Sequence, residues 1–555
     1  MESNRRRFFK TLGVGAAGIG LATSFPASAL SNGPKIKPVK EDGPILLIGD
    51  TIAVATTSYG KVRGFVLRGI HTFLGIPYGA DTSGANRFMP PQKPTPWADI
   101  RPAVWLGNTA PQIMDNRYAN AYSSFVDHWN YDDVSEDCLR MNVWTPSISD
   151  GKKRPVMVWL HGGGYTNGNA IEQDGYNGEN FSCTGDVVFC SLNHRLGPIG
   201  FSNLAGAGGE KYKASGNVGM LDIIAALKWV RDNIANFGGD PGNVTIMGQS
   251  GGGAKVCTVC AMPSAKGLVH KGVALSGSTT KGIDKNYSEK LGSYILQEAG
   301  LKSSEIDKLQ QIPWKEYILL ANKVAEKLTK ESGNTMMRGS FGPVADGIYL
   351  PKEQYYSDLE GFSANIPMII STMFNESSPS RTDSSLENIT LEGVKTKLKD
   401  RFGENTNKIV EAYSKTFPEK KPIEIWSLIA SNRQSAINTA NAKSKQKAPV
   451  YLAWFGWQPP LFDSRMRAFH CLDICFWYNN TDLMYTHTGG GSRPRRLSAK
   501  MSLALVQFMK TGNPNGTWLP EWPKYSVEKG ETMILDDMCE LKNDPDREAR
   551  KALPI

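Results

Sequence analysis

A serine flanked by glycines follows a short β-branched run within Asn243–Gly253. Val244–Met247 is typical of a buried strand, and the next five residues, Gly248-Gln-Ser-Gly-Gly252, fit the pattern G-x-S-x-G. Small residues on both sides of such a serine let the chain turn sharply from a strand into a helix, which exposes the hydroxyl. The helix N-terminus then offers N–H groups to a developing negative charge. Ser250 is therefore a candidate nucleophile.

A glycine run that suits an oxyanion hole lies upstream of the serine. Pro155–Leu160 is typical of a buried strand and leads directly into His161-Gly-Gly-Gly164. Without Cβ atoms, such a backbone can approach a substrate and turn two N–H groups toward one point. A tight structural turn is the alternative. The order of this run and the later serine favours the oxyanion hole, because it is the order of an α/β-hydrolase.

Three histidines follow Ser250, and the α/β-hydrolase order of serine, acid and histidine requires the base to be one of them. His270 comes too soon, and we expect it at the surface. His487 lies in a Thr/Gly-rich loop with no strand before it. His470 follows an apolar strand at Pro449–Phe455, so it is the better candidate for the base.

Glu376 is the candidate acid, because it lies in the loop just beyond the apolar strand Ile366–Ile370. Asp346 and Asp473 are the alternatives. The acid must hold the imidazole in one tautomer and stabilise the imidazolium, and a carboxylate of either type can do this.

The first 29 residues have the features of an export signal. Asn4–Lys10 holds three consecutive arginines, an apolar stretch follows at Leu12–Leu21, and Ala27-Ser-Ala29 suits cleavage. We expect residues 1–29 to be a twin-arginine signal peptide and residues 30–50 a loose lead-in. The mature protein would then be bacterial and either periplasmic or secreted. A disordered basic tail is the alternative.

Composition excludes several classes of function. Loss of residues 1–29 would lower the formal net charge from +9 to +6, and the remaining charge is scattered, so we expect no nucleic-acid partner. No later stretch is apolar for the roughly 18 residues that a membrane span needs. The eight cysteines are irregularly spaced, and Cys257-x-x-Cys260 lacks a second pair or a nearby histidine to complete a metal site. We expect these two cysteines to be buried thiols.

Strands and helices alternate around the candidate residues. Between the glycine run and the serine lie a strand at 186–192 and a helix at 221–230, and a hairpin is predicted within 52–69. This rhythm predicts an α/β fold with a mostly parallel sheet and helices on both faces. Two Lys-, Glu- and Leu-rich blocks, up to about residue 335 and from about 385 to 447, are predicted to be helical insertions over the active site. We expect a single domain over residues 51–555.

With these segments, the chain resembles the type-B carboxylesterases, the α/β-hydrolase family that includes bacterial para-nitrobenzyl esterases and animal cholinesterases. The resemblance covers nearly all of the chain after the signal. Further segments that carry it follow in the family's order, at Phe73–Gly79, Glu136–Asn142, Asn193–Leu196, Gly216–Asp222, Phe237–Thr245 and Thr511–Asn515.

The resemblance implies a triad of Ser250 as nucleophile, His470 as base and Glu376 as acid. It implies no cofactor and no metal. The turn at Ser250 has Gly-Gln-Ser-Gly where many relatives have Gly-Glu-Ser-Ala. The loop that holds Glu376 has Phe-Asn-Glu-Ser where Asp-Glu-Gly is usual. The implied oxyanion hole consists of backbone N–H groups from Gly163, Gly164 and Gly251.

The resemblance also bears on residues near the triad. Ser276 corresponds to a family serine that supports the triad, with simple packing as the alternative. Phe374 and Trp477 lie beside the acid and the base, so they are either pocket walls or core. Cys138 matches a cysteine that pairs upstream in animal members, but no cysteine precedes it here, so we expect it to be free.

The expected function is hydrolysis of a small-molecule carboxylic ester through an acyl-enzyme, in a hydrophobic gorge that excludes water. The same triad acting on an amide, carbamate or lactone is one alternative. A non-catalytic, cholinesterase-like binding protein is an alternative of another class, and the retained catalytic residues argue against it. The identity of the ester and the oligomeric state are not encoded in any pattern that we can interpret.

Overall fold

The computed structural model describes residues 43–113, 133–331, 341–431 and 433–554. Pro44–Ile555 forms one compact unit, and only this unit is described below. The predicted signal peptide and most of the lead-in lie outside the described residues. None of the helices in the described ranges combines the length and the apolar character needed to cross a membrane.

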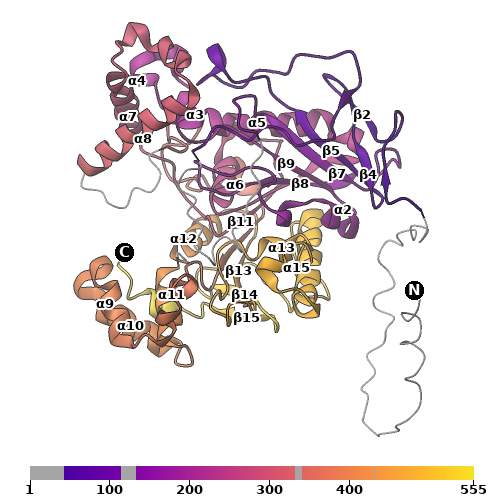
Figure 1. Cartoon of the computed structure of the whole chain (residues 1–555). Coiled ribbons are helices and arrows are strands. Elements are labelled where there is room, and N and C mark those ends of the chain that lie inside the picture. The colour runs from indigo at the N-terminus through magenta and orange to yellow at the C-terminus, as the bar shows by residue number, and fades with distance from the viewer. Residues whose placement is uncertain (1–42, 114–132, 332–340, 432, 555) are drawn as a thin grey trace, which may run out of the picture. The chain divides into compact units, whose positions relative to one another are not determined.

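A sheet of 12 strands runs through the unit (Figure 1). Its central strands, from β9 to β14, are parallel, and the strands at both edges are antiparallel. This confirms the predicted mostly parallel sheet. In spatial order the strands are β1 (Leu46–Leu47), β4 (Phe65–Leu67), β5 (Ile70–Pro77), β7 (Arg140–Thr145), β9 (Val188–Leu192), β8 (Arg154–Leu160), β10 (Gly239–Gln249), β11 (Lys271–Leu275), β12 (Met368–Met373), β13 (Val450–Phe455), β14 (Glu531–Leu535) and β15 (Glu540–Asn543).

A small second sheet contains the predicted hairpin. Strands β2 (Val54–Thr57) and β3 (Gly60–Arg63) pair antiparallel, and β6 (Arg101–Pro102) lies beside β3. The hairpin ends at Gly64, within the predicted range 52–69, and beyond it β4 joins the main sheet instead. The chain passes so close to β5 there that a Cβ atom on Gly64 would lie 2.0 Å from the carbonyl oxygen of Thr72. The break therefore requires glycine.

Helices cover both faces of the main sheet, as predicted (Figure 1). Side chains of successive strand residues point to opposite faces. In β8, Val158 belongs to an apolar core with helices α5 (Val218–Asn233) and α6 (Gly251–Ala261). Its neighbour Trp159 belongs to a second core with helix α15 (Ser492–Thr511). The shorter helices are α2 (Glu179–Gly185), α3 (Gly197–Phe201), α4 (Ala205–Gly208), α13 (Ile474–Trp477), α14 (Tyr485–Thr488) and α16 (Arg547–Arg550).

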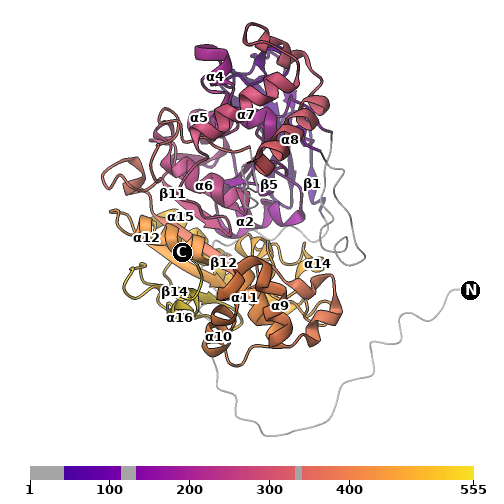
Figure 2. The same cartoon turned by 90° about the vertical axis from the view of Figure 1, so that its left-hand side faces the viewer.

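The two helical blocks are inserted after β11 and after β12. In Figures 1 and 2, the first block lies with α4, and α9 to α11 of the second block form a separate group. The last helix of the second block, α12, instead packs on β12 and β13. The first block holds α7 (Lys285–Glu298) and α8 (Trp314–Glu331), and the second holds α9 (Leu391–Phe402), α10 (Thr406–Thr416), α11 (Pro422–Ala430) and α12 (Arg433–Lys443).

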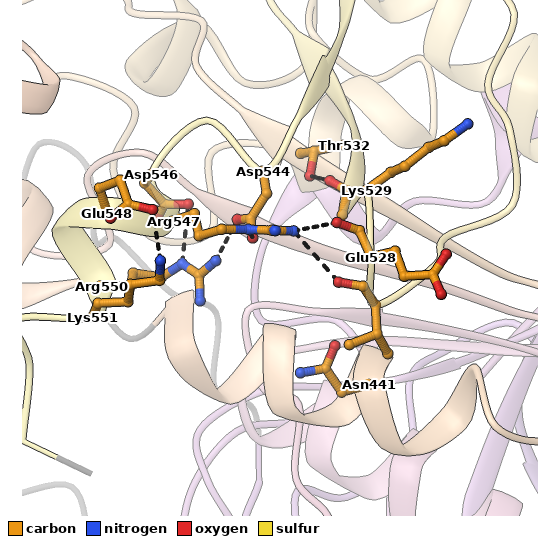
Figure 3. Close-up of polar contacts among 12 residues, drawn as sticks. Asn441, Glu528, Lys529, Thr532, Asp544, Asp546, Arg547, Glu548, Arg550 and Lys551 are labelled. Atoms are coloured by element: carbon orange, nitrogen blue, oxygen red, sulfur yellow. Dashed lines mark hydrogen bonds and ion pairs between the residues drawn. The ribbon is translucent and has the colours of Figure 1, made fainter.

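Ion pairs join the C-terminal helix α16 to the segment that follows β15, and the helix packs on α10. Asp544 accepts hydrogen bonds from both Arg547 and Arg550, and Arg547 also donates to the carbonyl oxygen of Glu528 at 2.7 Å (Figure 3). Arg550 also pairs with Asp546 at 3.1 Å. The arginines of this cluster are thus neutralised by carboxylates within it.

Candidate active site

Ser250 lies at the turn between β10 and α6. It has φ 58° and ψ −125°, a conformation that is strained for a side chain with a Cβ atom. The neighbouring glycines permit the turn, because a Cβ atom on Gly252 would lie 2.0 Å from the carbonyl oxygen of Leu160. The backbone N–H of Ser250 donates to the carbonyl oxygen of Leu275 at 2.8 Å, which ties the turn to β11. The local fold is that of a nucleophile elbow.

The predicted oxyanion glycines lie directly beside this turn. Strands β8 and β10 are parallel neighbours with Leu160 opposite Gly248, so the glycine run and Ser250 leave the sheet at the same edge. A Cβ atom on Gly251 would lie 2.1 Å from the carbonyl oxygen of Gly164. Gly163 and Gly164 are exposed and have φ of 80° and 64°. In the part of the chain that the structure describes, the N–H groups of Gly163, Gly164 and Gly251 have no hydrogen-bond acceptor.

The imidazole of His470 is hydrogen-bonded to Glu376. The distance from Nδ1 to Oε2 is 2.5 Å, and the side chains of His470 and Glu376 are 35% and 14% exposed. The other carboxylate oxygen, Oε1, accepts the backbone N–H of Met373 at 2.9 Å, and the N–H of Glu376 donates to Ser431 Oγ of the second helical block at 3.1 Å. The carboxylate is therefore held in place on both sides, and the imidazole keeps Nε2 for a proton.

Asn375 joins the loop of the acid to the loop of the base. Its backbone N–H donates to the carbonyl oxygen of Ala468 at 3.2 Å, and its Oδ1 accepts the N–H of Ala468 at 3.4 Å. Its Nδ2 donates to Ser427 Oγ of α11 at 3.0 Å. Sequence reasoning missed Asn375, because these contacts join residues 52 and 93 positions apart and no local sequence pattern indicates them.

Gln249 places the imidazole next to the elbow. Its Nε2 lies 3.2 Å from Nε2 and 3.3 Å from Nδ1 of His470, and its Oε1 accepts the Cys471 thiol at 3.2 Å. Gln249 is fully buried and directly precedes Ser250. Among the described residues, no hydrogen bond joins Ser250 Oγ to the imidazole; such contacts often form only when substrate binds.

The surroundings of His470 shift its pKa. Burial alone would lower this pKa, but the neighbouring Cys471 and Glu376 side chains raise it, and it lies well above its ordinary value. Burial raises the pKa of the Cys471 thiol, although His470 opposes this. Burial, followed by the charge of Glu376, raises the pKa of Asp473 to about 7. Asp473 accepts the indole N–H of Trp477 at 3.3 Å and makes no hydrogen bond to His470 among the described residues.

The remaining alternatives occupy other parts of the fold. Asp346 caps a turn, where its Oδ1 accepts three successive backbone N–H groups at 2.8–3.1 Å. His270 is half-buried and accepts the N–H of Val244 at 3.1 Å, rather than lying free at the surface. His487 is fully buried, with its ring centroid 5.2 Å from that of Phe469.

The secondary candidates are mostly packing residues. Phe374 is half-buried and stacks on Trp454 with ring centroids 3.8 Å apart, whereas Trp477 is fully buried in the core. Ser276 has φ 49° and a buried hydroxyl that finds no hydrogen-bond partner among the described residues. Cys257 and Cys260 are free buried thiols, as predicted, and Cys138 is also free. Within the described ranges no cluster of His, Cys, Asp and Glu side chains could hold a metal ion.

A family model and individual known proteins both place this chain in the same family. Residues 51–551 match the model of the carboxylesterase family. The para-nitrobenzyl esterase of Bacillus subtilis (strain 168) is 33% identical over 91% of this chain and 99% of its own length, and the phenmedipham hydrolase of Pseudarthrobacter oxydans is 29% identical over 88% and 96%.

The structural neighbours agree with this family. The solved structure of an esterase from Clostridium hathewayi, described as hydrolysing aliphatic aromatic polyesters, has a TM-score of 0.77 and 31% identity, over 91% of this chain and 98% of that one. The chain therefore shares the fold of this esterase. The chain belongs to the carboxylesterase family and is an α/β-hydrolase that hydrolyses carboxylic esters.

Proposed function

We propose that Ser250, His470 and Glu376 form the catalytic triad of this esterase, and that N–H groups of Gly163, Gly164 and Gly251 form its oxyanion hole. The observation that carries the proposal is the 2.5 Å hydrogen bond between His470 and Glu376, in a ring that Gln249 holds beside the strained Ser250 turn. This arrangement supports the assignment of the acid, the base and the nucleophile to these three residues.

The proposed chemistry has two half-reactions. Nε2 of His470 accepts the Ser250 proton while Oγ attacks the ester carbonyl, and Glu376 stabilises the resulting imidazolium. The tetrahedral oxyanion lies against the glycine N–H groups, and His470 then donates its proton to the leaving alcohol. Water repeats the sequence on the acyl-enzyme, which releases the carboxylic acid and restores Ser250. All protons pass through one imidazole, so no cofactor is needed.

The proposed substrate is a small carboxylic ester, bound in a gorge under the helical insertions. Ser427 of α11 accepts a hydrogen bond from Asn375, and Ser431, which directly follows α11, accepts one from the N–H of Glu376. These contacts support the proposal, because they fix the second block against the loop that carries Glu376. Export through the twin-arginine route, with residues 51–555 as one domain, stays a prediction that depends on the sequence pattern of residues 4–29.

Matched substrates test the proposal. A p-nitrophenyl ester and a p-nitroanilide with the same acyl group would be assayed with the parent protein and with Ser250→Ala. We expect ester turnover that falls by about 10³-fold or more in the variant. Equal rates of ester turnover in the parent protein and the variant would contradict the assignment of Ser250 as the nucleophile. Anilide turnover as fast as ester turnover would favour an amide substrate.

A further inference from the structure

A lysine side chain lies buried behind the glycine run. Lys255 occupies the second turn of α6 and is fully buried. Its Nζ donates to the carbonyl oxygen of His161 at 2.9 Å and lies 5.9 Å from the centroid of the Tyr165 ring. Burial lowers the pKa of Lys255 to about 7, with the Glu172 carboxylate opposing the shift. A buried amine is costly, so its retention at this position calls for a function.

The carbonyl that Lys255 holds belongs to the first peptide of the glycine loop. Because a peptide unit is planar, fixing the His161 C=O also fixes the direction of the Gly162 N–H and the position of the Gly162 Cα atom. That Cα atom lies beside the nucleophile, since a Cβ atom on Gly162 would be 3.5 Å from the Cβ atom of Ser250. The loop is thus anchored at its start from the nucleophile helix.

Beyond the hydrogen bond from His161 Nδ1 to the Gly162 carbonyl oxygen at 3.0 Å, the rest of the loop has few side-chain restraints of its own. Gly163 and Gly164 have positive φ and no side chains, so their backbone is free to leave the oxyanion-binding conformation. The carbonyl oxygen of Gly163 accepts the N–H groups of Thr166 and Asn167 at 3.3 and 3.0 Å, which anchors the far end of the loop. Lys255 provides the corresponding anchor at the near end.

We propose that Lys255 is a positioning residue that holds the His161–Gly164 loop in its oxyanion-binding conformation. This inference rests on the proposed function above. The amine carries N–H donors in both of its protonation states, so the anchor persists across pH. Its removal would weaken binding of the oxyanion, which exists in the transition state, and would leave binding of the uncharged ester largely intact.

The test compares Lys255→Met with Lys443→Met. Lys443 is a matched control, because it is also fully buried and donates to a backbone carbonyl, that of Ser363 at 2.5 Å, but lies on α12. For Lys255→Met we expect kcat to fall by about 10- to 100-fold, with KM changed less than about threefold. For Lys443→Met we expect kcat per active site to match the parent. Active sites are counted with a fluorophosphonate probe, so that unfolded protein does not enter kcat.

Three outcomes would overturn the inference. The first is that Lys255→Met keeps the kcat per labelled site of the parent protein. The second is that kcat falls as much in Lys443→Met as in Lys255→Met. The third applies where Lys255→Met does not fold: Lys255→Gln, which keeps a shorter N–H donor, would then show parental kcat per labelled site instead of an intermediate value. Failure of the proposed function is distinct, because the parent protein itself would then carry no label on Ser250.

Discussion

The side-chain amide of Gln249 lies 3.2 Å from Nε2 of His470. The same amide nitrogen lies 3.3 Å from Nδ1, so it rests against the face of the imidazole and does not take up the lone pair of either ring nitrogen. The Cys471 thiol, which donates to the amide oxygen at 3.2 Å, sets the orientation of the amide. Gln249 thus holds the ring beside the elbow and leaves the lone pair of Nε2 free. The hydrogen bond to Glu376 keeps the ring proton on Nδ1, which is the form that the proposed mechanism requires of a base.

Gln249→Glu is expected to move the pH profile. A carboxylate at this position stabilises the imidazolium, so the pKa of His470 rises further. The base is then neutral only at higher pH, and the acidic limb of kcat/KM moves up by about one pH unit. The profile would be measured with a neutral chromogenic ester. If the acidic limb of the kcat/KM profile of Gln249→Glu lies at the same pH as that of the parent protein, the contact between residue 249 and His470 is contradicted.

Glu376→Gln is expected to lower both activity and the pKa of the base. The amide cannot stabilise the imidazolium, so kcat falls by about 10²- to 10⁴-fold. On the proposed mechanism activity requires neutral His470, whose pKa lies well above its ordinary value, so kcat/KM of the parent protein is expected to rise with pH through this pKa. In Glu376→Gln the rise shifts to lower pH.

Asp473→Asn is the matched control for Glu376→Gln. Asp473 makes no hydrogen bond to His470 within the described residues, so we expect its variant to stay within about tenfold of parental kcat. If Asp473→Asn loses as much activity as Glu376→Gln, then the acid has been misassigned.

Gly252→Ala is expected to disrupt the elbow. The added Cβ atom would lie 2.0 Å from the carbonyl oxygen of Leu160, which is backbone and cannot move aside cheaply. We expect at least about a 100-fold loss of kcat/KM or loss of folded protein. Gly206→Ala on α4 is the control, because its Cβ atom would meet no atom closer than 3.4 Å. Parental activity in Gly252→Ala would show that the turn is looser than described.

The buried ion pair of Arg195 and Asp222 is expected to be important for stability. Both side chains are fully buried, and Asp222 accepts Nε, Nη2 and the backbone N–H of Arg195 at 2.7–3.0 Å. Asp222→Ala leaves a buried guanidinium without its carboxylate, so the free energy of unfolding falls by about 3–5 kcal/mol. Urea unfolding measures this. Asp232→Ala, which breaks an exposed pair with Arg231, should cost less than about 1 kcal/mol.

The strands that carry the site were predictable because their apolar runs are short and bounded by turns. Val244–Met247 and Pro155–Leu160 lie within β10 and β8, and the strand order places their ends side by side. Strand β14 was not predicted, since Glu531 and Thr532 interrupt its apolar pattern.

Side-chain partners at the site were less predictable than its strands. The contacts of Gln249 with His470, of Asn375 with Ala468 and of Lys255 with His161 join residues about 90 to 220 positions apart. These contacts depend on the conformations of loops that meet at one edge of the sheet. Loop conformations of this kind leave no periodic pattern in a single sequence. The glycine pattern of the elbow was predictable, because a turn this sharp excludes Cβ atoms at neighbouring positions in the sequence.

The most direct test of the account is labelling with a fluorophosphonate probe, with the adduct located by mass spectrometry. The account predicts rapid labelling of the parent protein at Ser250, no labelling of Ser250→Ala, and a rate that collapses in His470→Ala and falls in Glu376→Ala. Folded parent protein that takes no label, or labels at another residue, would contradict the claim that Ser250 is the activated nucleophile.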